Sequence, residues 1–158
     1  MTIRTGDRAP GFSLPTRPGE VVDVGESIGQ EPVVLLFFPL AFSPVCTNEM
    51  CSVRDGWSGW ADVGATVFGI TVDSPFITAK FRDELELPFP VLSDFNRAVA
   101  RQYGALHEDL MGLQGVPKRA VFVIAADGQV TYDWVSDDPG QMPDLEAVRA
   151  AVAATHAG

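Results

Sequence analysis

The chain has 158 residues, 46% hydrophobic and 20% charged, a balance that predicts one globular domain over residues 1–158 with a buried core. Its 11 Lys and Arg residues are outnumbered by 21 Asp and Glu, and the formal net charge of -10 argues against a nucleic-acid partner or an anionic membrane surface. The N-terminal residues lack the pattern of a signal peptide, and the longest apolar run, residues 33–38, is too short to span a bilayer, so we expect a cytoplasmic protein.

The first strand and the first helix flank a proline-rich loop. Residues 32–38 form a continuous β-branched and aromatic run, which predicts a buried strand. Residues 45–63 predict a helix, because apolar side chains recur at spacings of three and four, at Met50, Val53, Trp57 and Trp60. We expect this helix to fray around Gly56 and Gly59 and to stop at Gly64.

Further apolar runs continue the alternation of strands and helices. We expect strands over residues 65–72 and 91–92, and helices over 77–85 and 96–103. Two more strands, 119–125 and 129–135, flank Asp127-Gly128, a strong signal for an antiparallel hairpin. A last helix over 144–154 begins at Asp144, which can cap it. The order predicts an α/β protein with a mixed sheet covered by helices on both faces, as in thioredoxin-like folds.

Cys46 lies directly after a proline-rich loop, at the start of the first predicted helix. Free backbone N–H groups and the helix dipole at that position favour a thiolate, the nucleophilic form of cysteine. Attack on the distal oxygen of a peroxide would leave a sulfenic acid on Cys46. The chain holds one other cysteine, Cys51, and a pair so close in sequence is not the disulfide framework of a small secreted protein. The pair therefore indicates redox chemistry.

The segment PLAFSPVC, residues 39–46, resembles the active-site signature of peroxiredoxins, Pro-x-x-x-Thr/Ser-x-x-Cys. Pro39, Ser43 and Cys46 match the signature, and Glu49 fits it as well. The similarity extends over nearly the whole chain, through GDRAPGFSL, FPVLSD, ARQYGAL and RAVFVIAADG. The chain is most similar to the bacterioferritin comigratory protein group, with alkyl hydroperoxide reductase E as a near second.

The resemblance implies a role for each matching residue. Cys46 would be the peroxidatic cysteine, the Ser43 hydroxyl would bond both thiolate and peroxide, and Pro39 would shield the sulfur from water. Arg119 would be the cation beside the thiolate, and Glu49 would orient Arg119 through a bidentate pair. Such donors suit a leaving oxygen that develops negative charge.

Taken singly, these residues admit other interpretations. A cysteine at a helix start can be a small core residue, Pro39 can end a strand, and Ser43 can cap a turn. Arg119 can be a strand-edge charge, because Val121 and Ala125 depart from the Thr and Asp that are more usual in the family. We expect no cofactor and no metal. His107 and His156 show no metal-ligand spacing with the cysteines and are interpreted as surface or loop residues.

Cys51 decides how the oxidised enzyme would be regenerated. Residues five apart in a helix differ by about 140° around the axis and about 7.5 Å along it, which separates their Cα atoms by roughly 8.7 Å. A disulfide needs about 4.4 to 6.8 Å, so Cys46 and Cys51 can be joined only if the helix unwinds locally.

Part of the comigratory group carries a resolving cysteine at this spacing. The resemblance therefore implies that Cys51 attacks the Cys46 sulfenic acid, and that a thioredoxin- or glutaredoxin-type dithiol reduces the bond. In the alternative interpretation, Cys51 is a core residue and an outside thiol resolves Cys46 directly.

Two rival functions remain at this level. A thioredoxin-like thiol-disulfide oxidoreductase would share the fold but would need two cysteines separated by two residues. A redox-sensing binding module would use the cysteine pair to expose Trp57 and Trp60. The sequence leaves open whether hydrogen peroxide or an organic hydroperoxide is preferred, and whether the protein is a monomer or a homodimer.

Overall fold

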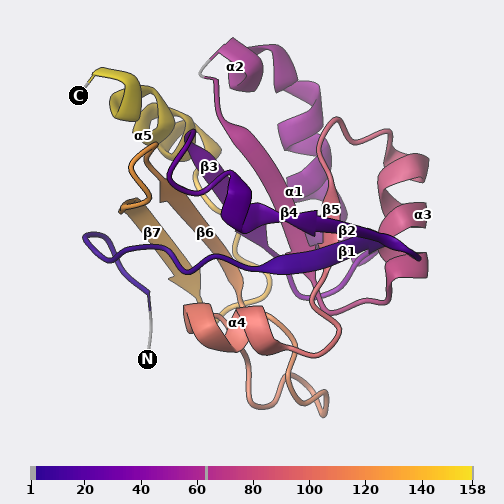
Figure 1. Ribbon diagram of the computed structural model, residues 1–158. Helices are drawn as coiled ribbons and strands as arrows, with labels where there is room; N and C mark the ends of the chain where they lie inside the picture. The colour runs from indigo at the N-terminus through magenta and orange to yellow at the C-terminus, as the bar shows by residue number, and fades with distance from the viewer. Residues whose placement is uncertain (1–2, 63, 158) are drawn as a thin grey trace.

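The structure, a computed structural model, describes residues 3–62 and 64–157 (Figure 1). Its centre is a five-stranded sheet in the order β5-β4-β3-β6-β7. The strands are β3 (Val33–Phe37), β4 (Thr66–Thr71), β5 (Val91–Ser93), β6 (Arg119–Ile124) and β7 (Val130–Ser136). Strands β3, β4 and β5 run parallel, whereas β6 is antiparallel to both β3 and β7. The sheet is therefore mixed, as predicted.

Helices cover both faces of this sheet. Successive side chains of a strand point to opposite faces, and in β3 all five are buried. On one face, Leu35 and Phe37 pack with α4 (Ala98–Tyr103) and the N-terminal segment. On the other face, Val34 and Leu36 belong to a core formed with the remaining helices, α1 (Pro44–Asp55), α2 (Trp57–Asp62), α3 (Pro75–Leu85) and α5 (Leu145–Ala157). Burial on both faces explains the uninterrupted apolar run of this strand.

The helix predicted over residues 45–63 is in fact two helices. The first, α1, ends at Asp55, and Gly56 donates its N–H to the Ser52 carbonyl at 3.2 Å before α2 begins at Trp57. Glycine is the weakest helix former apart from proline, so the interruption falls there, while Gly59 lies inside α2. The predicted end at Val63 lies outside the described residues. Gly64 has the left-handed φ of 69° that is typical just after a helix.

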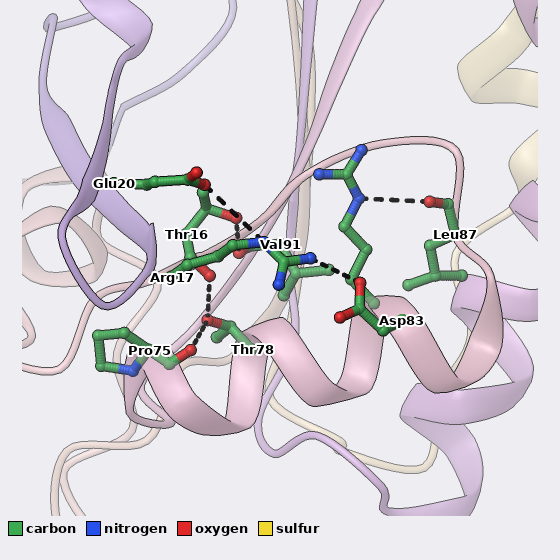
Figure 2. Close-up of polar contacts among 9 residues, drawn as sticks. Thr16, Arg17, Glu20, Pro75, Thr78, Asp83, Leu87 and Val91 are labelled. Carbon is green, nitrogen blue, oxygen red and sulfur yellow. Dashed lines mark hydrogen bonds and ion pairs between the residues drawn. The ribbon is translucent and has the colours of Figure 1, made fainter.

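An N-terminal hairpin that the sequence did not reveal lies across α3 and β5. It pairs β1 (Ser13–Arg17) with β2 (Glu20–Asp23) and is followed by the 3-10 helix η1 (Val24–Glu26). Figure 2 shows its anchors: the Thr16 hydroxyl donates to the Val91 carbonyl at 3.0 Å, and the Thr78 hydroxyl donates to the Thr16 carbonyl at 2.9 Å. An ion pair of 2.6 Å joins Arg17 to Asp83. The anchors are distant in sequence, but the hairpin itself is local, and Pro18-Gly19 at its turn was the signal that could have found it.

The remaining predicted elements are present with small shifts at their ends. The largest shift is at the end of α5, which runs to Ala157 rather than to residue 154, and α4 begins at Ala98 rather than at residue 96. Arg97 precedes it with a left-handed φ of 64°, and the Asp94 carboxylate accepts the N–H groups of Val99 and Ala100 at 3.2 and 2.7 Å. Within the described part of the chain, no helix has the length and apolar character needed to cross a membrane.

Residues 106–117, between α4 and β6, fold back on themselves as a loop hairpin. His107 donates its N–H to the Val116 carbonyl at 2.8 Å, and Gly115 donates to the His107 carbonyl at 3.0 Å. At the tip, Leu110 and Leu113 are joined by a bridge. The base of this 106–117 hairpin therefore lies beside α4, while its tip extends toward the start of α1, where it lines the cavity described next.

Candidate active site around Cys46

Cys46 is the third residue of α1, in the connection that follows the carboxyl end of β3. Ser43 has an extended backbone at the N-cap position, and Pro44 occupies the first helical position, where proline fits without strain. The first helical hydrogen bond runs from the Thr47 N–H to the Ser43 carbonyl at 2.9 Å. The Cys46 N–H precedes that bond, so it belongs to the N–H groups that lack an intrahelical partner. The side chain is 1% exposed.

Arg119 reaches the same sulfur from β6. Because Ala120 pairs with Phe37, the first residue of β6 lies beside the carboxyl end of β3. The Arg119 side chain is 1% exposed, and its Nη2 donates to Cys46 Sγ at 3.1 Å and to the Pro139 carbonyl at 2.9 Å. A buried guanidinium in contact with the sulfur is not a solvated strand-edge charge. It places a fixed positive charge and a donor at the Cys46 sulfur.

Glu49 lies behind this pair, fully buried in α1. Its Oε2 is 3.6 Å from Arg119 Nη1, and among the described residues neither Glu49 oxygen has a hydrogen-bond partner. The bidentate pair predicted from the sequence is therefore wrong: Arg119 uses Nη2 for Cys46 and Pro139, its Nε has no partner among the described residues, and Glu49 makes only the longer ion pair to Nη1. Burial raises the pKa of the Glu49 carboxyl to about 7, against the lowering effect of the Arg119 charge.

Pro39 and Ser43 both lie beside Cys46, but the Ser43 hydroxyl is turned toward the loop. It donates to the Leu40 carbonyl at 2.7 Å, so its proton is not directed at the sulfur here. Ser43 must rotate before it can donate to a bound molecule. Pro39 is buried and forms part of the wall around the sulfur.

A cavity of about 230 Å³ opens beside the sulfur. Cys46, Arg119 and Pro39 line it on the side of the sheet, and Leu110 and Met111 close it from the tip of the 106–117 hairpin. Met111 is 87% exposed and has a left-handed φ of 51°. The cavity thus offers a small molecule an apolar entrance that leads to one sulfur and one guanidinium.

Asp73 is a residue of this region that the sequence interpretation missed. It follows β4, and its Oδ2 accepts the Ala41 N–H at 2.7 Å and the Thr71 hydroxyl at 2.8 Å. Phe42, with a left-handed φ of 68°, packs its ring edge-on against Phe81 with centroids 5.0 Å apart. Two contacts therefore fix the 38–43 loop. An acidic residue just after a buried parallel strand was the available signal, because the carboxyl ends of such strands meet at one edge.

Cys51 lies further along the same helix, half-buried, and both cysteines are free. α1 is continuous from Pro44 to Asp55, so both cysteines lie in one intact helix. At this spacing in an intact helix the two sulfurs cannot form a disulfide. In the described residues, no group of three His, Cys, Asp or Glu side chains is arranged to hold a metal ion. His107 lies in a loop as expected, yet it is buried rather than on the surface.

The chain is similar to known proteins over nearly all its length. The sequence pattern of the AhpC/TSA family matches residues 5–133. A putative peroxiredoxin bcp of Coxiella burnetii is 36% identical over 137 residues, which cover 85% of this chain and 89% of that protein.

Solved structures give the same picture. The crystal structure of peroxidoxin BcpB from Mycobacterium tuberculosis has a TM-score of 0.82 and 34% identity, with 98% of this chain and 97% of that chain covered. A structure of the bacterioferritin comigratory protein of Xanthomonas campestris has a TM-score of 0.79 and 25% identity, with 93% of this chain and 92% of that chain covered. That structure is a trapped intermediate/ligand complex that concerns the alkyl peroxide reduction activity of the Xanthomonas protein.

Proposed function

The chain belongs to the AhpC/TSA family as a peroxiredoxin, and from that premise we propose that it is a thiol-dependent peroxidase that reduces hydrogen peroxide or organic hydroperoxides at Cys46. The observation that carries the assignment of Cys46 is its contact with Arg119: a buried guanidinium donates to Sγ at 3.1 Å at the start of a helix. A purely structural core cysteine has no need of such a cation.

The proposed first step is a displacement on oxygen. The Cys46 thiolate attacks the distal oxygen of ROOH, an S–O bond forms, and the O–O bond breaks. The departing RO⁻ carries the electron pair and takes a proton to become water or an alcohol, while Cys46 becomes a sulfenic acid. Arg119 and the N–H groups at the start of α1 supply donors for the developing charge, and Ser43 adds a third once its hydroxyl leaves the Leu40 carbonyl.

Regeneration is proposed to use Cys51. Its thiolate attacks the sulfenic sulfur, water leaves, and a Cys46–Cys51 disulfide forms, which a thioredoxin- or glutaredoxin-type dithiol then reduces. Because both cysteines lie in one intact helix, α1 must unwind in its first turns before the bond can form. The helix would thus be folded for attack and partly unfolded for resolution.

Stopped-flow tryptophan fluorescence of the reduced protein tests this cycle, with Trp57 and Trp60 of α2 as reporters next to α1. Peroxide should give a fast phase in the wild type and in Cys51→Ser, and none in Cys46→Ser. A fast phase that survives in Cys46→Ser would overturn the central assignment.

Mass spectrometry after one equivalent of peroxide separates the two routes of resolution. An intramolecular disulfide lowers the mass by two hydrogens, and Cys51→Ser should instead accumulate a sulfenic acid. If the wild type itself keeps a sulfenic acid without losing two hydrogens, Cys51 is structural and an outside thiol resolves Cys46.

The wider setting of the activity is part of the same proposal. We expect residues 1–158 to act as one domain in the cytoplasm, as a monomer or a homodimer. Light scattering of the reduced and oxidised protein distinguishes the two assemblies.

A further inference from the structure

A second and larger cavity, of about 700 Å³, lies between α4 and the base of the 106–117 hairpin. Arg97, Arg101 and His107 line it, and it shares no lining residue with the Cys46 cavity. The peroxidase cycle described above uses none of these three side chains. Their presence together in a chain with a net charge of -10 calls for a separate explanation.

Arg97 is held in one position by unusual backbone geometry. It has a left-handed φ of 64°, which non-glycine residues seldom adopt. Its Nε donates to the Gly115 carbonyl at 2.8 Å and its Nη1 to the Phe95 carbonyl at 3.3 Å. Gly115 fits closely around it, because a Cβ at that position would overlap Arg97 Cδ. The guanidinium is thereby preorganised, and its Nη2 has no hydrogen-bond partner among the described residues.

His107 provides the second observation. Its side chain is 8% exposed, and in the described structure its Nε2 is buried without any hydrogen-bond partner. Buried polar atoms are nearly always paired, so the unpaired Nε2 of a residue that lines the cavity indicates a partner that the described protein groups do not supply. Burial, reinforced by the charge of Lys118, lowers the pKa of His107, and a neutral ring can still donate one N–H.

The charges around the cavity select for a negative ligand. Arg101, on the exposed side of α4, forms no side-chain hydrogen bond or ion pair with any described residue, so its guanidinium is available. Glu108 is the acidic side chain among the lining residues, and it is exposed and can turn to water. Two arginines with unused donors beside an unpaired histidine are the donor set that phosphate and carboxylate groups require.

We propose that this cavity is a binding site for the phosphate or carboxylate group of a small organic anion, held by Arg97 and Arg101 with His107 as a third donor. Arg97 supplies the fixed contact and Arg101 the mobile one. The volume leaves room for an organic body in addition to the anionic group. The proposal goes beyond the peroxidase function and does not depend on it, because the two cavities share no residue.

Isothermal titration of the reduced full-length protein with pyrophosphate and with citrate tests the site. Arg101→Gln should weaken binding by about tenfold or more, which is the loss of one charged contact. Gly115→Ala should weaken it as well, because the new methyl group displaces Arg97. Arg4→Gln is the matched control: Arg4 is exposed, its guanidinium forms no hydrogen bond or ion pair with the described residues, and its loss changes the net charge equally.

The outcomes are decisive in both directions. Preference for pyrophosphate identifies a phosphate ligand, and preference for citrate a carboxylate ligand. The proposal is overturned if neither probe binds saturably, or if Arg4→Gln weakens binding as much as Arg101→Gln does. Because Arg101 is exposed, its variant should fold, and an unchanged rate of reaction with peroxide verifies this independently.

Discussion

The side chains around Cys46 Sγ compete for a small number of hydrogen bonds. Arg119 divides its donors between the sulfur and the Pro139 carbonyl, and Glu49 stays behind it without a hydrogen bond in the described structure. The position of the guanidinium is therefore fixed by its hydrogen bond to a backbone carbonyl as much as by charge. Both bonds come from one nitrogen, Nη2, while Nε and Nη1 have no hydrogen-bond partner among the described residues.

Replacing Arg119 tests this division of labour. Arg119→Met should slow the reaction of Cys46 with peroxide by roughly 10² to 10³, the usual cost of removing a preorganised donor at a developing charge. Arg119→Lys should fall between the wild type and the Met variant, because an ammonium keeps the charge but lacks the planar, rigid guanidinium that holds Nη2 between Cys46 Sγ and the Pro139 carbonyl. The second-order rate constant is measured by stopped flow in a Cys51→Ser background. Equal rates for the Lys and Met variants would show that geometry matters and charge does not.

Glu49 should make stability depend on pH. Burial raises its pKa from 4.5 to about 7, so between these values the folded protein binds a proton that the unfolded chain has released. The stabilisation is complete below the unfolded pKa and is lost as the pH rises through the folded one. We expect the urea midpoint to fall from pH 5 to pH 7 in the wild type, and to fall less in Glu49→Gln.

The matched control for Glu49→Gln is Glu84→Gln, which changes an exposed carboxylate of α3. That variant should keep the full decline of the wild type. A Glu49→Gln protein whose midpoint follows the wild type at every pH would mean that the buried carboxyl stays ionised beside Arg119.

Some of this site could be predicted from the sequence and some could not. Pro39, Ser43 and Cys46 lie within eight consecutive positions, and a contiguous motif fixes its own local geometry. The hydroxyl direction of Ser43 is local too, because it donates to the Leu40 carbonyl three residues earlier, whereas the spacing of Glu49 depends on where Arg119 lies after folding. Such long-range geometry leaves no trace in a local pattern, and the bidentate pair was wrong for that reason.

At the scale of elements, the proposed cycle requires the 38–43 loop and the first turns of α1 to be ordered for attack and released for resolution. Asp73 holds the loop through the Ala41 N–H at 2.7 Å. Asp73 is a positioning residue, because it is not among the residues that line the Cys46 cavity and acts through the loop.

Asp73→Asn should therefore change the two steps in opposite directions. A neutral acceptor binds the Ala41 N–H more weakly, so the reaction with peroxide should slow by about tenfold through misplacement of the loop. Disulfide formation should become faster, because the same contact no longer resists unwinding. Both phases appear in one stopped-flow trace, and Asp83→Asn, which removes a surface ion pair, is the control. Slowing of both phases would indicate general damage to the fold.

The β1–β2 hairpin offers a separate test of stability. In Thr78→Val the Thr16 carbonyl loses its hydroxyl donor in a buried position, and we expect a loss of about 1 to 3 kcal/mol in the free energy of unfolding. Urea denaturation measures it. Thr131→Val, the same change at an exposed position of β7, should cost much less, because that hydroxyl makes only a long bond of 3.4 Å to the Val123 carbonyl. Similar losses of unfolding free energy in both variants would show that the Thr→Val change itself, and not the loss of the hairpin anchor, causes the effect.

The element predictions succeeded where the signal was local. β3, β4 and β6 fall within one residue of their predicted ends, because each is a continuous apolar run closed by turn residues. The β1–β2 hairpin was missed although its pairing is local and turns at Pro18-Gly19; only its anchors, from Thr16 and Arg17 to β5 and α3, are long-range. Glycine content alone could not decide whether the helix breaks at Gly56 or at Gly59, because both positions carry the same residue.

At the scale of the whole molecule, the sheet order creates the site. Three segments far apart in sequence meet beside the carboxyl end of β3: the start of α1, the start of β6, and the loop at Pro139 (Figure 1). Only an antiparallel β6 brings its first residue, Arg119, to that end of β3. A parallel strand in the same place would bring its last residue there instead.

The charge of the molecule as a whole supports a last prediction. With 11 positive against 21 negative side chains, exposed carboxylates repel one another across the folded surface, and mobile ions weaken that repulsion. Raising NaCl from about 0.02 to about 0.5 M, which shortens the screening length severalfold, should therefore raise the thermal midpoint. Replacing the exposed carboxylates Glu26 and Glu84 by Gln should raise the midpoint at low salt and reduce its dependence on salt. Calorimetry measures both, and KCl in place of NaCl should give the same curve if screening, rather than ion binding, is the cause. A midpoint that falls as salt is added would instead show that surface ion pairs such as Lys118–Asp137 outweigh the net repulsion.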